Sequence, residues 1–381
     1  WWQFMVVQLA CTRIGAISCP LIPILRHREV ADMVARSGAR VLIVPEQFRG
    51  HDFAAMAERV RGTVPTLEHV LVARGPREAG DSFHEVLLDH GRRATDDLDA
   101  RRPAVDAVAT LQFTSGTTGE PKGVMHTHNS LFATTRLVPW ALGLDASDVV
   151  VMPSPLAHAS GFLYGVLMPL VWGMPVAYQD RWSAEEMLRI VDAESATWTI
   201  GSPPFAMDTI EACLRLDRTA GTLRLFSCAG APIPRHLVAE TQRVTGARMA
   251  AMWGLTETGA VTITPLADLG RAQDSDGRPS PAMQVRIADE EGVECGPGES
   301  GRMLVRGASR FVGYFGRPDL TAAVVDEVRS RGRFFIFTSP MPAAAAGAAV
   351  AAIRSIRDDL SRLELLRANV ARFRRGMGET G

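Results

Sequence analysis

The chain has 381 residues, of which 46% are hydrophobic and 22% charged, values typical of a globular protein with room for two domains. A formal net charge of −1 gives no reason to expect nucleic acid or an anionic membrane as a partner. The five cysteines are scattered and lack C-x-x-C spacing, which favours a reducing, cytoplasmic compartment over a disulfide framework or a metal site. The chain opens with two tryptophans and no methionine, so we expect it to come from a longer protein.

The first part of the chain alternates segments of helical and strand character. We predict helices at 1–17, 28–37 and 53–61, strands at 41–44 and 69–72, and a polar surface connection at 75–104 with helical residues at 83–91. Helices that alternate with short apolar strands are typical of an α/β fold, in which helices flank parallel sheets.

Three further predicted strands end in turns of small residues. The strands at 111–113, 149–152 and 223–228 precede a Gly-rich loop, a Pro-containing loop and the turn at 230–232. We expect a helix after each turn and a ligand site at the carboxyl ends of the strands. From about residue 283 the pattern changes to short alternating strands at 284–287 and 301–306, which predicts a small β-rich subdomain.

One uncharged stretch, residues 159–178, has about the length of a membrane-spanning helix. Several glycines and prolines interrupt it, and Gly173, Met174 and Pro175 are typical of a turn between a helix and a following strand. We therefore predict a buried helix and strand here and no membrane span.

The loop after the strand at 111–113 has the residue types of a phosphate-binding site. Residues 114–123 are T-S-G-T-T-G-E-P-K-G. Glycines let backbone N–H groups converge on phosphate oxygens, hydroxyl side chains add donors, and Lys122 supplies a cation. Lys122 is the only lysine of the chain, so any chemistry that needs an amine depends on it. The spacing differs from the Walker motif, and the alternative is a polar loop without a ligand.

Five motifs in this order resemble those of the adenylate-forming superfamily, which includes acyl-CoA synthetases, luciferases and peptide-synthetase adenylation domains. They are the loop at 114–123, P-L-A-H-A-S-G at 155–161, C-A-G-A-P at 228–232, W-G-L-T-E at 253–257, and the segment 298–318, which begins G-E-S-G-R and ends G-Y-F-G-R-P. The resemblance covers about residues 1–325. It implies a large nucleotide-binding domain, which we place at 1–327, with the β-rich subdomain from about 283.

The resemblance implies roles for individual residues. It assigns phosphate binding to Thr114, Ser115, Gly116, Thr117, Thr118, Gly119 and Lys122, and the adenine pocket to Gly230, Ala231, Pro232, Trp253 and Gly254. The Trp253 ring can stack on adenine, although the family usually has tyrosine there. The Thr256 hydroxyl can bond the α-phosphate, and the Glu257 carboxylate suits Mg²⁺. His158 would border the acyl pocket. The alternative for Glu257 is a solvated surface carboxylate, and the alternative for His158 is a structural role.

The reaction implied by the resemblance joins ATP to a carboxylate to give an acyl-adenylate and pyrophosphate, followed by thioester formation with coenzyme A. The expected catalytic residues are Lys122, His158, Thr256 and Glu257, and the expected cofactors are ATP, Mg²⁺ and coenzyme A. The substrate would be a small carboxylic acid of the medium-chain, fatty or alicyclic type. The oligomeric state stays open.

The resemblance ends near residue 325. The family continues to an aspartate in a T-G-D context, a hinge and a small domain with a second lysine, none of which follows here. We therefore expect impaired activity; the alternative is a non-catalytic or poorly folded ATP- or acyl-binding fragment of a fused gene. The segment 328–381 is predicted to be a helical tail, with apolar residues at helical spacing over 353–373. Its residues 334–342 resemble a piece of the pyridoxal-phosphate α-oxoamine synthases, whose Schiff-base lysine the tail lacks.

Overall fold

The computed structural model describes residues 1–73, 83–89, 98, 100–115 and 120–322. All of them belong to one compact unit that spans 1–331. The predicted helical tail and its boundary at residue 328 lie outside the described residues and stay predictions.

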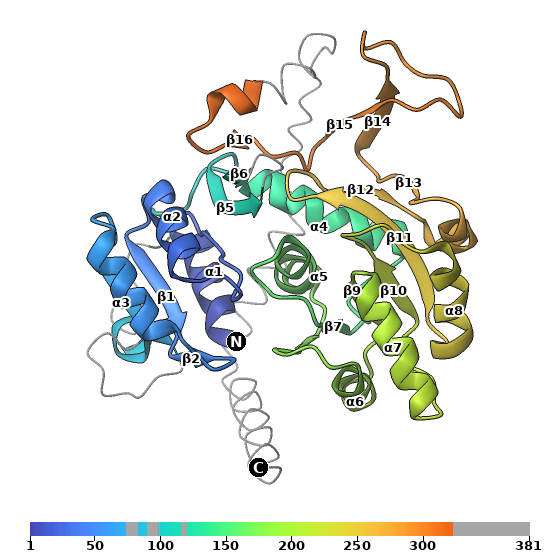
Figure 1. Ribbon diagram of the computed structural model, residues 1–381, viewed down its shortest axis with the longest axis horizontal. Coiled ribbons are helices and arrows are strands. Elements are labelled where there is room, and N and C mark those ends of the chain that lie inside the picture. The colour runs from blue at the N-terminus through green and yellow to red at the C-terminus, as the bar shows by residue number, and fades with distance from the viewer. Residues whose placement is uncertain (74–82, 90–97, 99, 116–119, 323–381) are drawn as a thin grey trace. The chain divides into compact units, whose positions relative to one another are not determined.

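The N-terminal part contains a small parallel pair of strands with helices packed against it (Figure 1). Its elements are α1 (Trp2–Ile14), α2 (His27–Ser37), β1 (Val41–Pro45), β2 (Gln47–Phe48), β3 (His51–Asp52), α3 (Phe53–Thr63), β4 (His69–Ala73) and η1 (His84–Asp89). β1 pairs in parallel with β4, and apolar residues of α2 and α3 share one core with them. The helices and strands predicted over residues 1–73 are confirmed, with ends that differ by at most three residues.

A seven-stranded sheet forms the centre of the unit, in the order β13-β12-β11-β10-β9-β7-β8. Its strands are β7 (Val150–Met152), β8 (Val176–Tyr178), β9 (Trp198–Gly201), β10 (Leu225–Cys228), β11 (Arg248–Leu255), β12 (Gly259–Ile263) and β13 (Arg278–Pro279). The strands from β8 to β11 are parallel, as predicted, while β12 and β13 are antiparallel to their neighbours. A turn of three residues joins β11 to β12, and so short a connection permits only antiparallel pairing.

Helices cover both faces of this sheet (Figure 1). They are α4 (His128–Leu142), η2 (Gly161–Leu167), α5 (Met168–Trp172), α6 (Ala184–Glu194), α7 (Pro203–Arg215), α8 (Arg235–Thr245) and η3 (Leu266–Gln273). Successive strand residues point to opposite faces: Leu225 packs in the core with α4, η2 and α5, and Phe226 packs in the core with α6, α7 and α8. The sheet is therefore buried on both sides, as the apolar strand segments predict.

The Gly-rich loop does not lead into a helix. The predicted order of strand, turn and helix is therefore wrong at this position. β5 (Val108–Ser115) is followed by an antiparallel strand, β6 (Pro121–Thr127), and the helix α4 starts only after it. Proline is tolerated as the first residue of a strand, and the helix signal comes at Thr127, whose side chain accepts a hydrogen bond from the Ser130 amide. The register places Lys122 opposite Thr114. The expected order is found after β7 and β10, which lead into η2 and α8.

Two smaller sheets complete the described residues. β16 (Gly313–Tyr314) adds an antiparallel third strand to β5 and β6, so that segments almost 190 residues apart in the sequence lie side by side (Figure 1). β14 (Met283–Ala288) pairs with β15 (Arg302–Gly307) in a two-stranded antiparallel sheet, which confirms the short strands predicted after residue 283.

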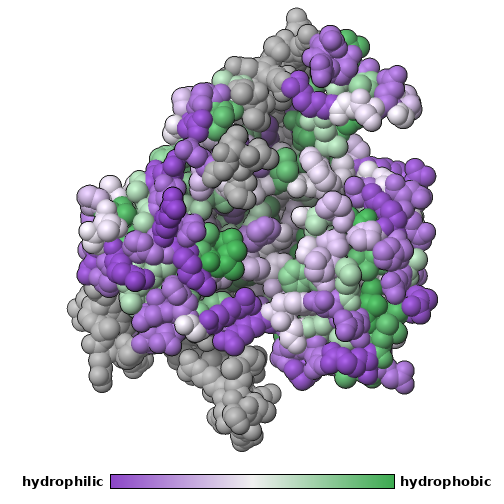
Figure 2. Space-filling view, in the orientation of Figure 1, coloured by the Kyte–Doolittle hydropathy of each residue, from purple (hydrophilic) through white to green (hydrophobic). Residues whose placement is uncertain are grey.

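The uncharged stretch 159–178 folds as predicted into helix, turn and strand; η2 is buried, whereas Leu170 and Val171 of α5 are exposed and β8 is partly buried. η2 and α5 are followed by Gly173, which ends α5 in a left-handed conformation with φ 69°, and then by β8. None of the helices in the described part of the chain is long and apolar enough to cross a membrane. The face drawn in Figure 2 is mostly hydrophilic, with smaller groups of hydrophobic residues between the hydrophilic ones.

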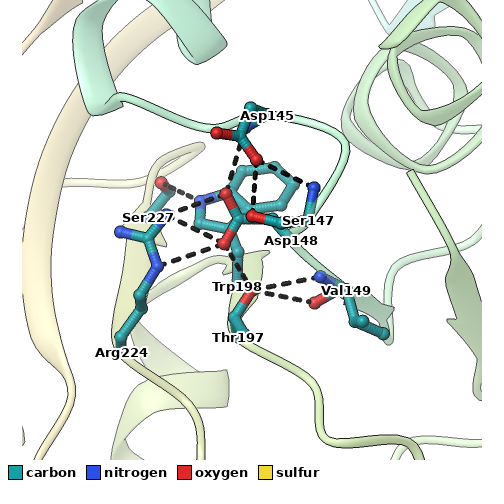
Figure 3. A network of polar contacts seen from close by, with 8 residues as sticks. All are labelled: Asp145, Ser147, Asp148, Val149, Thr197, Trp198, Arg224 and Ser227. Carbon is teal, nitrogen blue, oxygen red and sulfur yellow. Dashed lines mark hydrogen bonds and ion pairs between the residues drawn. The ribbon is translucent and has the colours of Figure 1, made fainter. Parts of the chain in front are cut away.

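A polar network ties together the amino ends of three neighbouring strands (Figure 3). Asp148, two residues before the start of β7, is only 4% exposed. Its carboxylate accepts hydrogen bonds of 2.8 Å from Arg224, before β10, and of 2.6 Å from the hydroxyl of Thr197, before β9. Since the ligand-binding edge of a parallel sheet is the opposite one, we assign this network to stability.

We predict that Asp148→Ala lowers the free energy of unfolding by roughly 1.5–3 kcal/mol, because charge-assisted hydrogen bonds to Arg224 and Thr197 are lost together. The measurement is urea unfolding, with the slope checked for equality between variants. Asp192→Ala is the control: Asp192 also bonds an arginine, Arg218, at 2.6 Å, but its side chain is 45% exposed, so its loss should change stability by less than about 1 kcal/mol. Equal effects of the two substitutions would contradict the assignment.

Candidate active site

Three of the five motifs, at 155–161, 228–232 and 253–257, lie at one edge of the large sheet. Because β7, β9, β10 and β11 are parallel neighbours, their carboxyl ends lie at the same edge. The loop with His158 follows β7, and Gly230 follows β10 with a φ of 84°. Cys228 of β10 is in register with Ala251 of β11. Gly230 and Trp253 each come two residues later, so the turn at 230–232 and Trp253 are neighbours on adjacent strands. The proposed adenine-pocket residues thus lie close together, as the motifs indicate.

Gly254 has a structural reason to be glycine. A Cβ atom at this position would lie 2.0 Å from the carbonyl oxygen of Gly259, on the paired strand β12. The register of β11 and β12 shifts between Trp253 and Gly254, which is where the backbones come this close. Gly254 therefore shapes the hairpin that carries Trp253.

The turn between β11 and β12 carries Thr256 and Glu257, and distant segments hold its backbone. The carbonyl of Thr256 accepts a hydrogen bond of 2.7 Å from the ring of His126, in β6. The carbonyl of Glu257 accepts one of 2.7 Å from the amide of Phe311. The carbonyl of Thr258 accepts one of 2.7 Å from the hydroxyl of Ser309. Three consecutive carbonyls are thus bound by donors from outside the hairpin, which holds the backbone from which the Glu257 side chain projects.

His126 was not among the sequence candidates, although it lies four residues after Lys122. It is 2% exposed, and both ring nitrogens have partners. Nε2 donates to the Thr256 carbonyl, so Nδ1, 3.0 Å from the Ser130 hydroxyl, is the acceptor in the neutral ring. Burial lowers the pKa of His126 below its ordinary value of 6.5, against the opposing effects of the Thr256 carbonyl and Glu257. The neutral imidazole therefore links β6 to the Thr256–Thr258 turn.

Tyr314 connects the two charged residues of the site. Its hydroxyl donates a hydrogen bond of 2.7 Å to Oε1 of Glu257. The Lys122 ammonium lies 5.6 Å from the centre of the Tyr314 ring, within the range of a cation–π contact. Burial, and after it the neighbouring Glu257 carboxylate, raises the pKa of Tyr314, so the phenol stays a donor. Lys122 and Glu257, which are 135 positions apart in the sequence, meet at one tyrosine.

The Gly-rich loop, predicted to bind phosphate, is described only at its two ends. Thr114 and Lys122 face one another across β5 and β6, while Gly116, Thr117, Thr118 and Gly119 lie outside the described residues, as does the side chain of Ser115. The loop nevertheless leaves and re-enters the sheet beside the Lys122, Tyr314 and Glu257 group.

His158 lies in the loop after β7 and is exposed. Its Nδ1 accepts a hydrogen bond of 3.3 Å from the Ser160 amide. An amide can only donate, so the proton of the neutral imidazole is on Nε2. His158 thus shares the sheet edge with the other motifs and presents an N–H donor.

The described residues contain no group of three or more His, Cys, Asp or Glu side chains placed to hold a metal ion. A Mg²⁺ ion that arrives with ATP needs only one or two protein carboxylates, because phosphate oxygens and water complete its coordination. Glu257 fits that requirement, since its hydrogen bond with Tyr314 occupies Oε1 and leaves Oε2 outside that contact.

Together, the fold and the site define an α/β nucleotide-binding domain. The family model of AMP-binding enzymes matches residues 1–315, and the chain belongs to that family. It is 31% identical over 330 residues to the medium-chain fatty-acid–CoA ligase of Escherichia coli strain K12, covering 86% of this chain and 57% of that protein. It is also 31% identical to the 2-hydroxy-7-methoxy-5-methyl-1-naphthoate–CoA ligase of Streptomyces carzinostaticus, covering 84% and 59%.

A solved structure supports the fold. A long-chain-fatty-acid–CoA ligase from Archaeoglobus fulgidus matches with a TM-score of 0.73 and 24% identity, over 84% of this chain and 64% of that one. The chain therefore spans less than two thirds of the length of these proteins. The resemblance to the adenylate-forming superfamily is confirmed over the part that these proteins share with it.

We predict that His126→Leu lowers the free energy of unfolding by roughly 1–3 kcal/mol at pH 7, because the Thr256 carbonyl loses its donor. The folded chain keeps His126 neutral, whereas the unfolded chain takes up a proton near the ordinary pKa of 6.5. The contribution of His126 to the free energy of unfolding is therefore complete above that pH and decreases as the pH falls. Unfolding curves at several pH values test this, with the exposed His236→Leu as control. A gap between parent and variant that widens toward acid pH would refute the buried neutral ring.

Proposed function

We propose that this chain activates a small carboxylic acid with ATP, forming an acyl-adenylate and pyrophosphate. The observation that carries the proposal is the meeting of Lys122 and Glu257 at Tyr314, beside both ends of the Gly-rich loop. One cation for phosphate and one carboxylate for a phosphate-bound metal are the groups that the handling of ATP needs.

In this proposal each motif has one task. The loop from Thr114 to Gly119 and the Lys122 ammonium bind the phosphates, and the Thr256 hydroxyl bonds the α-phosphate. Trp253 and the turn Gly230-Ala231-Pro232 hold the adenine, since an indole ring offers a stacking surface and the turn lies beside it. His158 borders the acyl group with its N–H donor.

The chemical need is a good leaving group. A carboxylate oxygen is too basic to leave. When it attacks the α-phosphorus of ATP, the bond to pyrophosphate breaks and an acyl-phosphate mixed anhydride forms, from which AMP can later leave. The chain's own residues contribute by positioning the carboxylate against the α-phosphate and by neutralising charge there. Mg²⁺ bound at Glu257 would supply further positive charge to the phosphates.

We propose a medium-chain, fatty, alicyclic or aryl acid as substrate and coenzyme A as the acceptor of the acyl group. The support is the likeness to relatives that are named as ligases of a medium-chain fatty acid and of a naphthoate with coenzyme A. Both proteins are longer than the part that aligns with this chain, so the complete reaction is carried over as a proposal.

We predict that Lys122→Ala and Glu257→Ala each weaken the binding of ATP with Mg²⁺ by one to two decades, because a charge-assisted contact worth roughly 1.5–3 kcal/mol is lost. Isothermal titration calorimetry measures the affinity. Glu240→Ala on α8 is the control. It also removes a glutamate side chain, but one that forms a surface ion pair with Arg243. If both site variants bound ATP with the affinity of the parent, the proposed roles of Lys122 and Glu257 in ATP binding would be wrong.

A second experiment tests acid activation. The chain is incubated with ATP, Mg²⁺ and a panel of medium-chain, alicyclic and aromatic acids, and pyrophosphate is measured with and without coenzyme A. Acid-dependent release that Lys122→Ala abolishes is the expected result. Binding of ATP with no acid-dependent release for the whole panel would favour a nucleotide-binding role without catalysis.

A further inference from the structure

Tyr314 comes from a segment that is attached to both halves of the proposed site. On one side it belongs to β16, which pairs with β6 immediately after Lys122. The amides of Val312 and Phe315 donate to the carbonyls of Met125 and Gly123 at 2.9 and 2.8 Å. The segment is therefore part of the sheet that carries the phosphate loop.

On the other side, the same segment holds the Thr256–Thr258 turn. Ser309 bonds the Thr258 carbonyl, Phe311 bonds the Glu257 carbonyl, and Tyr314 bonds the Glu257 carboxylate. Seven residues, 309–315, thus connect two sheets at the point where the nucleotide is proposed to bind. Of these three contacts, that of the Tyr314 hydroxyl reaches the carboxylate itself.

We propose that Tyr314 is a positioning residue that holds the Glu257 carboxylate ready for the Mg²⁺ of ATP and supports the Lys122 ammonium with its ring; this rests on the proposed ATP-binding function. The hydrogen bond at Oε1 fixes the rotamer of Glu257 and keeps Oε2 available to the cation. A carboxylate that is already oriented binds the metal without first losing side-chain freedom.

The effects of the Tyr314 hydroxyl and of its ring can be tested separately, because the two groups contact different residues. The Tyr314 ring packs edge-on against Phe311, with 4.9 Å between ring centres, and lies under Lys122. Tyr314→Phe keeps both ring contacts and removes only the hydrogen bond to Glu257. Tyr314→Leu removes the aromatic support of Lys122 as well.

The experiment measures ATP affinity of the full chain by calorimetry across a Mg²⁺ series and in EDTA. For Tyr314→Phe we expect roughly 2- to 10-fold weaker binding with Mg²⁺, the range for one lost hydrogen bond, a higher Mg²⁺ requirement and an unchanged affinity in EDTA. For Tyr314→Leu we expect weaker binding in EDTA as well. Tyr178→Phe is the matched control, because its hydroxyl also donates a short hydrogen bond, of 2.8 Å to the Gly165 carbonyl in another part of the fold, beside a longer contact of 3.5 Å to the Met5 sulfur.

Each outcome decides a separate question. If the parent binds no ATP, the proposed function fails. If the parent binds ATP and Tyr314→Phe has the same Mg²⁺ dependence, the positioning role of Tyr314 is overturned while the function stands. A fall in melting temperature with equal effects in Mg²⁺ and in EDTA would show that the tyrosine serves only packing, and that result also overturns the proposal.

Discussion

The three backbone carbonyls of the Thr256–Thr258 turn determine how this site is assembled. A tight hairpin turn cannot satisfy all of its own carbonyls, and a buried carbonyl without a donor is costly. Here the donors come from His126, 130 positions before Thr256, and from Ser309, 51 positions after Thr258, together with the amide of Phe311. Glu257 can therefore take its place only when the β5–β6 hairpin and the segment 309–315 have both folded against the turn.

Stability and binding are assigned to opposite edges of the large sheet. At the amino ends, Asp148, Thr197 and Arg224 are joined by short hydrogen bonds that secure β7, β9 and β10 (Figure 3). At the carboxyl ends lie the loop of His158, the turn after β10 and Trp253, which the rigid strands hold in place. Such a division leaves the loops at the binding edge able to differ among relatives that act on different acids, while the sheet stays the same.

The sequence could predict much of the fold, because the signals are local. Apolar runs and glycine ends located the N-terminal elements, and the small-residue turn after β10 indicated its place at the sheet edge. A helix was predicted in place of the strand β6, because a Gly-rich loop suggests a helix start. The capping signal at Thr127 comes only six residues after Pro121. The five motifs identified Lys122, Trp253 and Glu257 as candidates. Neither Tyr314 nor His126 could be assigned a task, since their partners are distant in the sequence and only the folded chain brings them into contact.

The central claim is that Lys122, Glu257 and Tyr314 form one preassembled site for ATP with its metal. A crystal structure of the chain with ATP and Mg²⁺ tests it most directly. The account predicts phosphates at the Gly-rich loop and Lys122, the metal on Oε2 of Glu257, the Tyr314 hydroxyl still on Oε1, and the adenine beside Trp253. A nucleotide bound elsewhere, or a Glu257 side chain turned away from Tyr314 and the metal, would contradict it.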